Sequence, residues 1–149
     1  KETRGDPMDV FTRQKRSRIM ASIRSKNSSF ERSFSKWLGA LSLVAPEYHP
    51  DDIFGKPDFV FRDRKIAVFL DSCFWHGCRK HFRMPKGNRE YWSEKIRRNR
   101  LRDGRVNRVL RKEGWRVFRI WEHSLKNPRS RERCQANLVN ILSRSDARQ

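Results

Sequence analysis

Residues 55–71 read GKPDFVFRDRKIAVFLD and predict the β-hairpin on which the fold is built. Gly55-Lys56-Pro57 is typical of a turn, and it is followed by a short strand over residues 58–61. A charged turn then leads into residues 66–70, whose continuous apolar run is typical of a buried strand. We therefore expect two antiparallel strands at the centre of the domain.

Apolar residues at helical spacing predict helices on both sides of this hairpin. Residues 115–121 predict a further strand, parallel to residues 66–70 and reached through a right-handed crossover. The fold class is therefore α/β, with helices around a mixed sheet. The helices are expected over residues 12–24, from Ser28 or Ser29 onward, over residues 89–112 and over residues 129–142.

The chain is strongly basic, with 36 Lys and Arg against 17 Asp and Glu and a net charge of +19. Such an excess favours a polyanionic partner such as nucleic acid. Basic residues recur along the exterior of the helix expected over residues 89–112, where we expect Arg98 and Arg102 to contact DNA. Residues 45–76 instead carry six acidic and four basic residues, and this local reversal needs an explanation.

Three carboxylates are expected to converge at one end of the hairpin. Asp58 begins the first strand and Asp71 follows the second, while Glu31 can approach from the preceding helix. Converging carboxylates repel one another unless they share a cation, and oxygen ligands favour Mg²⁺. The alternative is that Asp58 caps the turn before its strand and that Glu31 pairs with a neighbouring arginine.

A second cluster combines thiols with imidazoles. Cys73, Cys78 and His81 are close enough in sequence to bind one cation, and His123 is the best candidate for a fourth ligand. Sulfur and imidazole ligands in a set of four predict a structural Zn²⁺. His76 competes as a ligand, and the alternative is a pair of buried thiols beside surface histidines.

Large aromatic residues lie next to these ligands. Phe74 and Trp75 follow a strand end in a polar loop, and Trp92 opens the long basic helix. Rings on a cationic surface can stack on bases or insert between them. The alternative is ordinary burial in the core.

The chain shows no apolar run of the ~18–20 residues needed to span a membrane, and its three cysteines do not suggest a disulfide framework. We expect an intracellular protein of the cytoplasm or nucleoid. A single domain is expected over residues 12–143. Residues 1–11 are expected to be a disordered arm or an expression remnant, and residues 144–149 a C-terminal tail.

Five stretches of the chain, in this order, resemble the very-short-patch-repair (Vsr) DNA mismatch endonucleases. The likeness covers roughly residues 12–125, and the Cys-Phe-Trp-His block is its most specific part. The stretches are residues 55–60 (GKPDFV), 69–78 (FLDSCFWHGC), 91–96 (YWSEKI), 114–117 (GWRV) and 121–123 (WEH).

The resemblance implies a restriction-endonuclease-like core of the PD-(D/E)XK type that nicks double-stranded DNA 5′ of the thymine of a T:G mismatch. Asp58 matches the aspartate that binds Mg²⁺, Glu31 the glutamate that supports it, and His76 the general base. With His76 in catalysis, the zinc set becomes Cys73, Cys78, His81 and His123.

The resemblance also implies how DNA is engaged. Phe74, Trp75 and Trp92 match an aromatic wedge that enters from the major groove, and Met20 falls where an apolar side chain enters from the minor groove. Leu70 and Asp71 depart from the family pattern. We therefore expect the second metal contact to be the Leu70 main-chain carbonyl, with Asp71 adding a ligand or orienting a water.

The leading hypothesis is thus a monomeric Mg²⁺-dependent mismatch endonuclease with a structural Zn²⁺ and mismatch-repair proteins as further partners. One alternative is a non-catalytic, zinc-stabilised module that binds distorted DNA. Another is an endonuclease of the same fold without mismatch preference.

Overall fold

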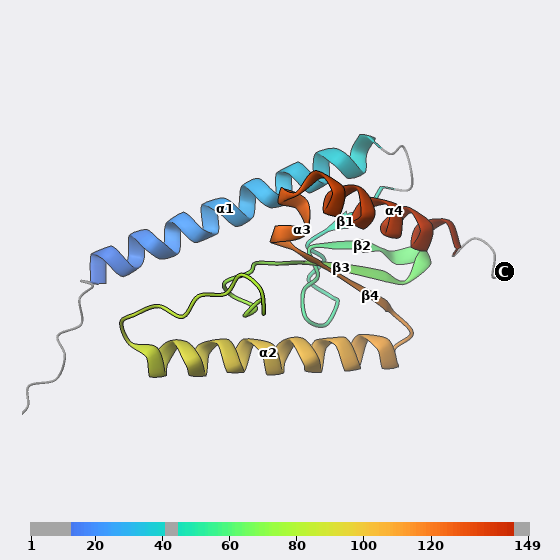
Figure 1. The fold of residues 1–149 in the computed structure, drawn as a ribbon. Helices are drawn as coiled ribbons and strands as arrows, with labels where there is room; N and C mark the ends of the chain where they lie inside the picture. The colour runs from blue at the N-terminus through green and yellow to red at the C-terminus, as the bar shows by residue number, and fades with distance from the viewer. Residues whose placement is uncertain (1–12, 41–44, 145–149) are drawn as a thin grey trace, which may run out of the picture.

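The structure, a computed structural model, describes residues 13–40 and 45–144. It arranges them in three layers, with a sheet between α2 on one side and α1 and α4 on the other (Figure 1). The helices are α1 (Arg13–Ala40), α2 (Arg89–Lys112), α3 (Glu122–Lys126) and α4 (Pro128–Arg144). The strands are β1 (Glu47–Tyr48), β2 (Phe59–Phe61), β3 (Ile66–Asp71) and β4 (Arg116–Trp121), with a short 3₁₀ turn over Arg62–Arg64.

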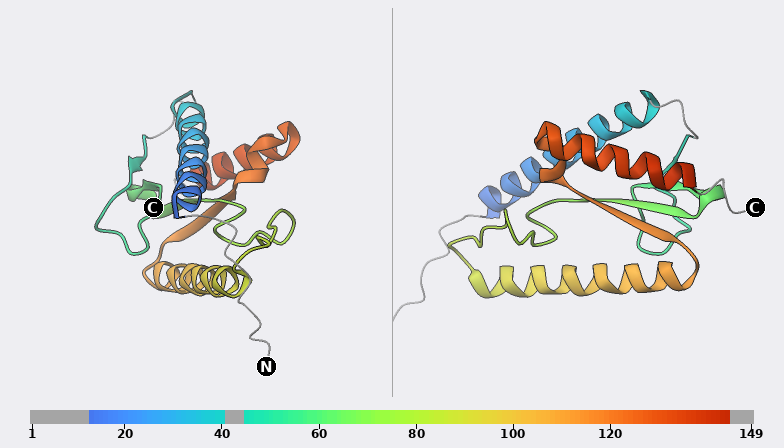
Figure 2. Two further views of the ribbon diagram at one scale, coloured as in Figure 1. Left: turned by 90° about the vertical axis from the view of Figure 1, so that its left-hand side faces the viewer. Right: turned by 45° about the vertical axis from the view of Figure 1, so that its right-hand side comes forward.

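The sheet is mixed, and its strand order is β1-β2-β3-β4. β2 pairs antiparallel with both β1 and β3, and Phe59 lies opposite Val68 in the hairpin. β3 and β4 are parallel, with Ile66 opposite Arg116 and Asp71 opposite Trp121. The connection between them contains α2, which covers one face of the sheet (Figure 2).

The side chains of β3 alternate between two hydrophobic cores. Ile66 and Val68 belong to the core formed with α1 and α4, in which Phe34 and Leu138 are almost fully buried. Ala67 and Phe69 face α2 and pack in the second core. A strand that buries both faces needs apolar residues at successive positions, which is why its sequence is continuously apolar. The α2 members of the second core are Val106 and Leu110.

The predicted hairpin, the helix over residues 89–112 and the parallel strand are confirmed, so the mixed α/β class is correct. Two separate helices near the N-terminus were the wrong expectation, because residues 13–40 form one continuous helix. Residues 25–29 (SKNSS) contain neither proline nor glycine, so nothing in them interrupts the helix. The expected arm over residues 1–11 and all but residue 144 of the expected tail lie outside the described residues.

Within the described ranges, the helices are too short or too polar for any of them to cross a membrane.

Two glycines test the packing of the sheet layer against α2, one in the loop that contacts the helix and one within the helix itself. Gly55 has a φ of +83°, and a Cβ there would lie 2.4 Å from a methyl carbon of Val106. We expect Gly55→Ala to lower the free energy of unfolding by about 2 kcal/mol or more, because strain and overpacking add. Gly104 lies within α2 with open space around a Cβ, so Gly104→Ala should raise it by about 0.5–1 kcal/mol.

Urea denaturation of both variants measures these changes. An equal effect of the two substitutions would contradict the close approach of residues 53–57 to α2.

Candidate active site

The chemistry-bearing residues gather at one edge of the sheet, where β3 and β4 end and β2 begins (Figure 1). Asp58 precedes β2, and Asp71 is the last residue of β3. Residues 72–82 form the loop that follows β3, and α3 follows β4 directly. Antiparallel and parallel pairing therefore bring three distant segments of the chain to one place.

Glu31, His49 and Asp58 form the first group at this edge, with one ligand atom of each within 4.8 Å of the others. The His49 ring contacts the Glu31 carboxylate, and the His49 amide donates to the Asp58 carbonyl over 3.1 Å. Glu31 thus approaches Asp58 from α1, as expected from the sequence, and its contact is a histidine and not an arginine. His49 was missed, because one histidine beside a two-residue strand carries no sequence signal.

The Asp58 carboxylate is largely buried. One of its oxygens accepts the Leu70 amide proton over 2.7 Å, which places the Leu70 main chain beside it. Burial raises the pKa of Asp58, and the charges of Glu31 and Asp71 raise it further against the effect of the Leu70 hydrogen bond. A buried carboxylate with a raised pKa beside a second carboxylate fits a hard cation, because a divalent ion removes the repulsion and accepts oxygen ligands.

A buried network occupies the opposite side of β3. Both oxygens of Asp71, which is 2 % exposed, accept from Nη1 of Arg119 at 2.7 and 2.9 Å. His76 Nδ1 lies 2.6 Å from an Asp103 oxygen and 3.7 Å from an Asp71 oxygen. Arg119 also approaches Asp103 at 3.5 Å, so one guanidinium joins two carboxylates. Asp103 and Arg119 were not predicted from the sequence.

This network fixes the ring of His76. Burial on its own would raise the pKa of Asp103, but the hydrogen bond and charge of His76, with the charges of Arg119 and Arg102, lower it. An ionised Asp103 accepts a hydrogen bond from Nδ1–H, which leaves Nε2 of His76 with a lone pair. Burial raises the pKa of Asp71 against the charges of His76 and Arg119. Asp71 is not among the three residues of the Asp58 group.

Cys73, Cys78, His81 and His123 form a second candidate metal site, with all four ligand atoms within 4.8 Å of one another. The sulfur of Cys73 lies 3.2 Å from His123 Nδ1, and that of Cys78 lies 3.6 Å from Nδ1 of each histidine. Tetrahedral Zn²⁺ requires sulfur-to-nitrogen distances of about 3.5 Å. The donor set therefore fits such an ion, and His76 lies outside this group.

The pKa shifts of Cys73 and His123 bear on whether these residues can bind a metal. Burial and the neighbouring Cys78 thiol raise the pKa of Cys73 to about 11, so a bound cation would have to displace its proton. Burial and the charges of His81 and Lys80 lower the pKa of His123, which keeps the imidazole neutral and able to coordinate. The third cysteine, Cys134, packs against the hydrophobic core on α4.

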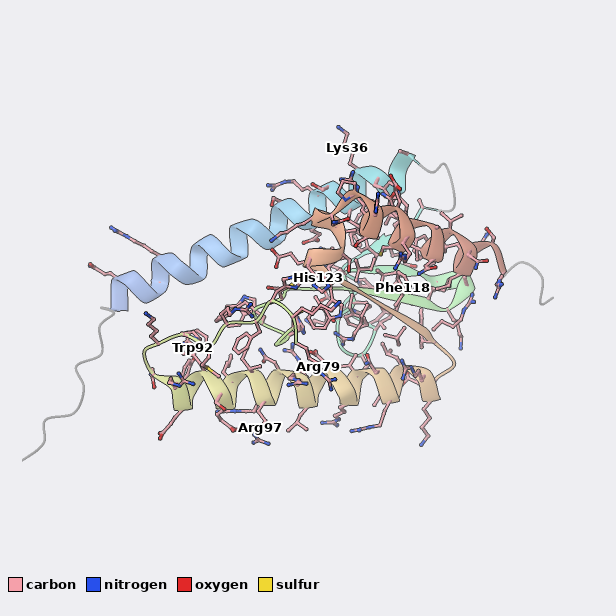
Figure 3. The ribbon with its side chains drawn as sticks, in the orientation of Figure 1. Lys36, Arg79, Trp92, Arg97, Phe118 and His123 are labelled. Carbon is pink, nitrogen blue, oxygen red and sulfur yellow. The ribbon has the colours of Figure 1, made fainter. Side chains whose placement is uncertain are left out.

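Five aromatic rings cluster where the loop meets the start of α2, and Figure 3 shows Trp92 at this end of the helix. Phe74 contacts Trp75 and Trp92 at centroid distances of 5.1 and 5.3 Å, and Trp75 lies 6.1 Å from Trp92. Phe82 and Tyr91 complete the cluster. Asn99 of α2 donates to the Trp75 carbonyl over 2.9 Å, which holds the loop against the helix.

The remaining predicted DNA-binding residues lie on the two long helices. Arg98 and Arg102 are exposed on α2, where Arg98 pairs with Glu94 at 3.1 Å and Arg102 approaches Asp103 at 3.7 Å. Met20 lies within α1, but its side chain is outside the described residues. The N-terminal parts of α1 and α2 extend beyond the sheet on the same side (Figure 2).

Comparison with known proteins identifies the family. The family profile described as "DNA mismatch endonuclease Vsr" matches residues 8–82. The DNA mismatch endonuclease Vsr of Escherichia coli K12 is 33% identical over 119 residues, which cover 79% of this chain and 76% of that protein. The chain belongs to the Vsr family of DNA mismatch endonucleases. It is therefore an endodeoxyribonuclease, and the predicted resemblance is confirmed.

Other Vsr relatives are named as nicking enzymes. The Type II nicking enzyme V.XorIIP of Xanthomonas oryzae is 37% identical over 92% of this chain and 98% of its own length. The Type II nicking enzyme V.NaeI of Lentzea aerocolonigenes is 56% identical over 73 residues, and the match spans only 44% of that protein.

The raised pKa of Asp58 predicts a pH-dependent effect of Asp58→Asn on stability in the absence of divalent cations. A carboxyl whose pKa is higher in the folded chain than in the unfolded chain loses stability as the pH rises through that range. Asparagine mimics the protonated form and can still accept from Leu70. We expect Asp58→Asn to raise the melting temperature by about 2–4 °C at neutral pH and by progressively less toward pH ~4.

The measurement is thermal unfolding with a chelator present, from about pH 4 to pH 8. Asp51→Asn is the control, because the Asp51 side chain is 92 % exposed and pairs with the exposed Lys56. A lower melting temperature for Asp58→Asn than for the wild-type chain at neutral pH would contradict the inference that the ionised Asp58 carboxylate destabilises the fold.

Proposed function

We propose that this Vsr-family protein nicks double-stranded DNA on the 5′ side of the thymine of a T:G mismatch, in a reaction that requires Mg²⁺. The observation that carries the proposal is the position of Asp71, which lies between the Asp58 group and the His76–Asp103 pair. A cation-binding carboxylate and an oriented base at one sheet edge are what phosphodiester hydrolysis needs.

Asp58 binds the cation in this proposal, together with the Leu70 main-chain carbonyl. Glu31 supports the site from α1, and His49 orients Glu31 through their direct contact. Bound Mg²⁺ would stabilise the negative charge that develops on the scissile phosphate.

His76 is the general base in this proposal. Asp103 accepts from Nδ1, so Nε2 is free to take a proton from the attacking water. Asp71 helps to orient His76 in this proposal and is not a metal ligand, because both of its oxygens accept hydrogen bonds from Arg119.

The cysteine and histidine group holds Zn²⁺ in this proposal and stiffens the loop over residues 73–81. Three of its ligands lie on this loop, and Phe74, Trp75 and His76 lie between the first two. An aromatic wedge on a disordered loop would lose binding free energy to ordering, so a fixed loop binds DNA better. Phe74, Trp75 and Trp92 insert from the major groove, and Met20 inserts from the minor groove.

Insertion of rings can itself provide mismatch preference. Unstacking a base step costs a few kcal/mol, and it costs less at a mispaired base. The net charge of +19 and the exposed Arg98 and Arg102 provide attraction that does not depend on sequence. We further propose a PD-(D/E)XK core for the domain over residues 12–143, action as a monomer in the cytoplasm or nucleoid, and cooperation with mismatch-repair proteins.

An endonuclease of the same fold without mismatch preference is the second candidate, because two of the relatives above are named nicking enzymes. A non-catalytic module that binds distorted DNA is a weaker alternative, since it does not explain the oriented His76–Asp103 pair.

A nicking assay on a small panel of duplexes tests the proposal. We expect Mg²⁺-dependent nicking of a T:G duplex, at a rate well above that of matched and other mispaired duplexes. Asp58→Ala should lower the rate by ~10³-fold or more while retaining DNA binding. Trp75→Ala should lower the preference for T:G over matched DNA by about ten-fold, since stacking contributes ~1–3 kcal/mol per base.

Equal nicking of all duplexes would favour the second candidate. Absence of nicking of every duplex, under conditions where the wild-type chain and Asp58→Ala both bind them, would favour the binding module.

Metal analysis tests the proposed zinc site. We expect about one zinc per purified chain, and loss of that zinc in Cys73→Ser together with a lower melting temperature. Cys134→Ser and His76→Ala should retain the zinc, because neither residue belongs to the proposed ligand set. Full zinc content in Cys73→Ser would refute the assignment.

A further inference from the structure

A pocket of about 320 Å³ lies on the outer side of the Cys/His group, next to His76. Its wall includes Gly77, Trp121 and His123, and its cationic members are Arg79, Lys80 and Arg100. Figure 3 shows Arg79 between the sheet edge and α2. We refer to this pocket as the basic pocket.

The positive charges around the basic pocket are not balanced by an acidic residue in its lining. Among the described residues, none that lines it is acidic, and none of its three cations forms an ion pair. On the same helix, Arg97 and Arg98 both pair with Glu94, and Arg102 approaches Asp103. Like charges that converge without counter-ions favour the binding of an anion.

A glycine at position 77 lets the loop that carries Arg79 and Lys80 approach α2 closely. Gly77 has a φ of +60°, and a Cβ there would lie 2.7 Å from Ile96 and 3.4 Å from Cδ of Arg100. The loop can therefore approach α2 closely only with glycine at this position. The contact packs the aliphatic part of Arg100 against the loop, and Arg100 lines the same pocket as the two loop cations.

We propose that Arg79, Lys80 and Arg100 bind a backbone phosphate of the DNA strand that is cut, close to the scissile phosphate. The proposal rests on the proposed function only for the choice of DNA as the source of the phosphate. Because His76 lines both this pocket and the candidate active site, the bound phosphate lies next to the bond that is hydrolysed. Such a contact sets the register of the strand and carries no base information.

DNA binding without divalent cations tests this assignment, because no cleavage is then required. Arg100→Gln and Lys80→Gln keep most of the aliphatic packing and remove the charge. Each should weaken binding to T:G and matched duplexes alike and lower the slope of log Kd against log salt by about one, over about 50–200 mM salt. Arg133→Gln is the control, because it removes the same charge from exposed α4 on the other face of the sheet.

Single methylphosphonate substitutions in the cut strand locate the contact. At one phosphate near the cut, a neutral methylphosphonate should weaken DNA binding by the wild-type chain. The same methylphosphonate should not weaken DNA binding by Arg100→Gln any further, because the charge that contacts this phosphate is already absent. A pocket for free phosphate, or general attraction alone, would give additive losses at every position and would overturn the proposal. Equal effects of Arg100→Gln and Arg133→Gln would do the same. A failure to nick T:G duplexes, with the coupling at one phosphate intact, would refute the proposed function and not the pocket.

Discussion

Parallel pairing of β3 with β4 places Asp71 opposite Trp121, so the chain leaves both strands at the same edge of the sheet. The loop after β3 carries Cys73 and Cys78, and α3 after β4 carries His123, so this one pairing assembles ligands that are distant in sequence. The same register sets which side chains face α2. A slip of one residue in β3 would turn Asp71 toward α1 and α4 and would separate it from Arg119 and His76. The packing of the core and the geometry of the site therefore depend on one strand register.

A buried charge accompanies this register. Asp71 ends an otherwise apolar strand, and an unpaired carboxylate at that position would cost several kcal/mol. Arg119 on the neighbouring strand satisfies both oxygens and reaches Asp103 on α2, while its guanidinium lies 4.6 Å from the Phe69 ring centre. The network thus links β3, β4 and α2, and it holds His76 in one orientation. A buried ion pair contributes little net stability, so its value here lies in fixing geometry.

Local patterns were enough to predict the hairpin, the parallel strand and the long helix, because each has its own apolar periodicity and turn residues. They also predicted that Glu31 approaches Asp58 and that His123 lies near Cys73, Cys78 and His81, since strand ends at one edge restrict what can meet. Only the family resemblance removed His76 from the ligand set. The partners of the network could not be predicted. Asp103 and Arg119 lie among many charged residues of α2 and β4, and only the packing of helix on sheet selects them. The continuity of α1 was missed because serine-rich residues favour a helix cap locally, whereas the helix continues across them.

In the proposed function, the loop over residues 73–81 joins DNA recognition to chemistry. Trp75 and His76 are neighbours, and α2 holds both of them, through Asn99 and Asp103 respectively. Asn99 and Asp103 are four residues apart and therefore lie on the same face of the helix, one turn from each other. A displacement of the Trp75 ring that shifts its backbone would therefore strain the contact that orients His76. The same loop also provides three residues of the candidate zinc site, so a bound ion would hold its backbone on both sides of the segment that carries Phe74, Trp75 and His76.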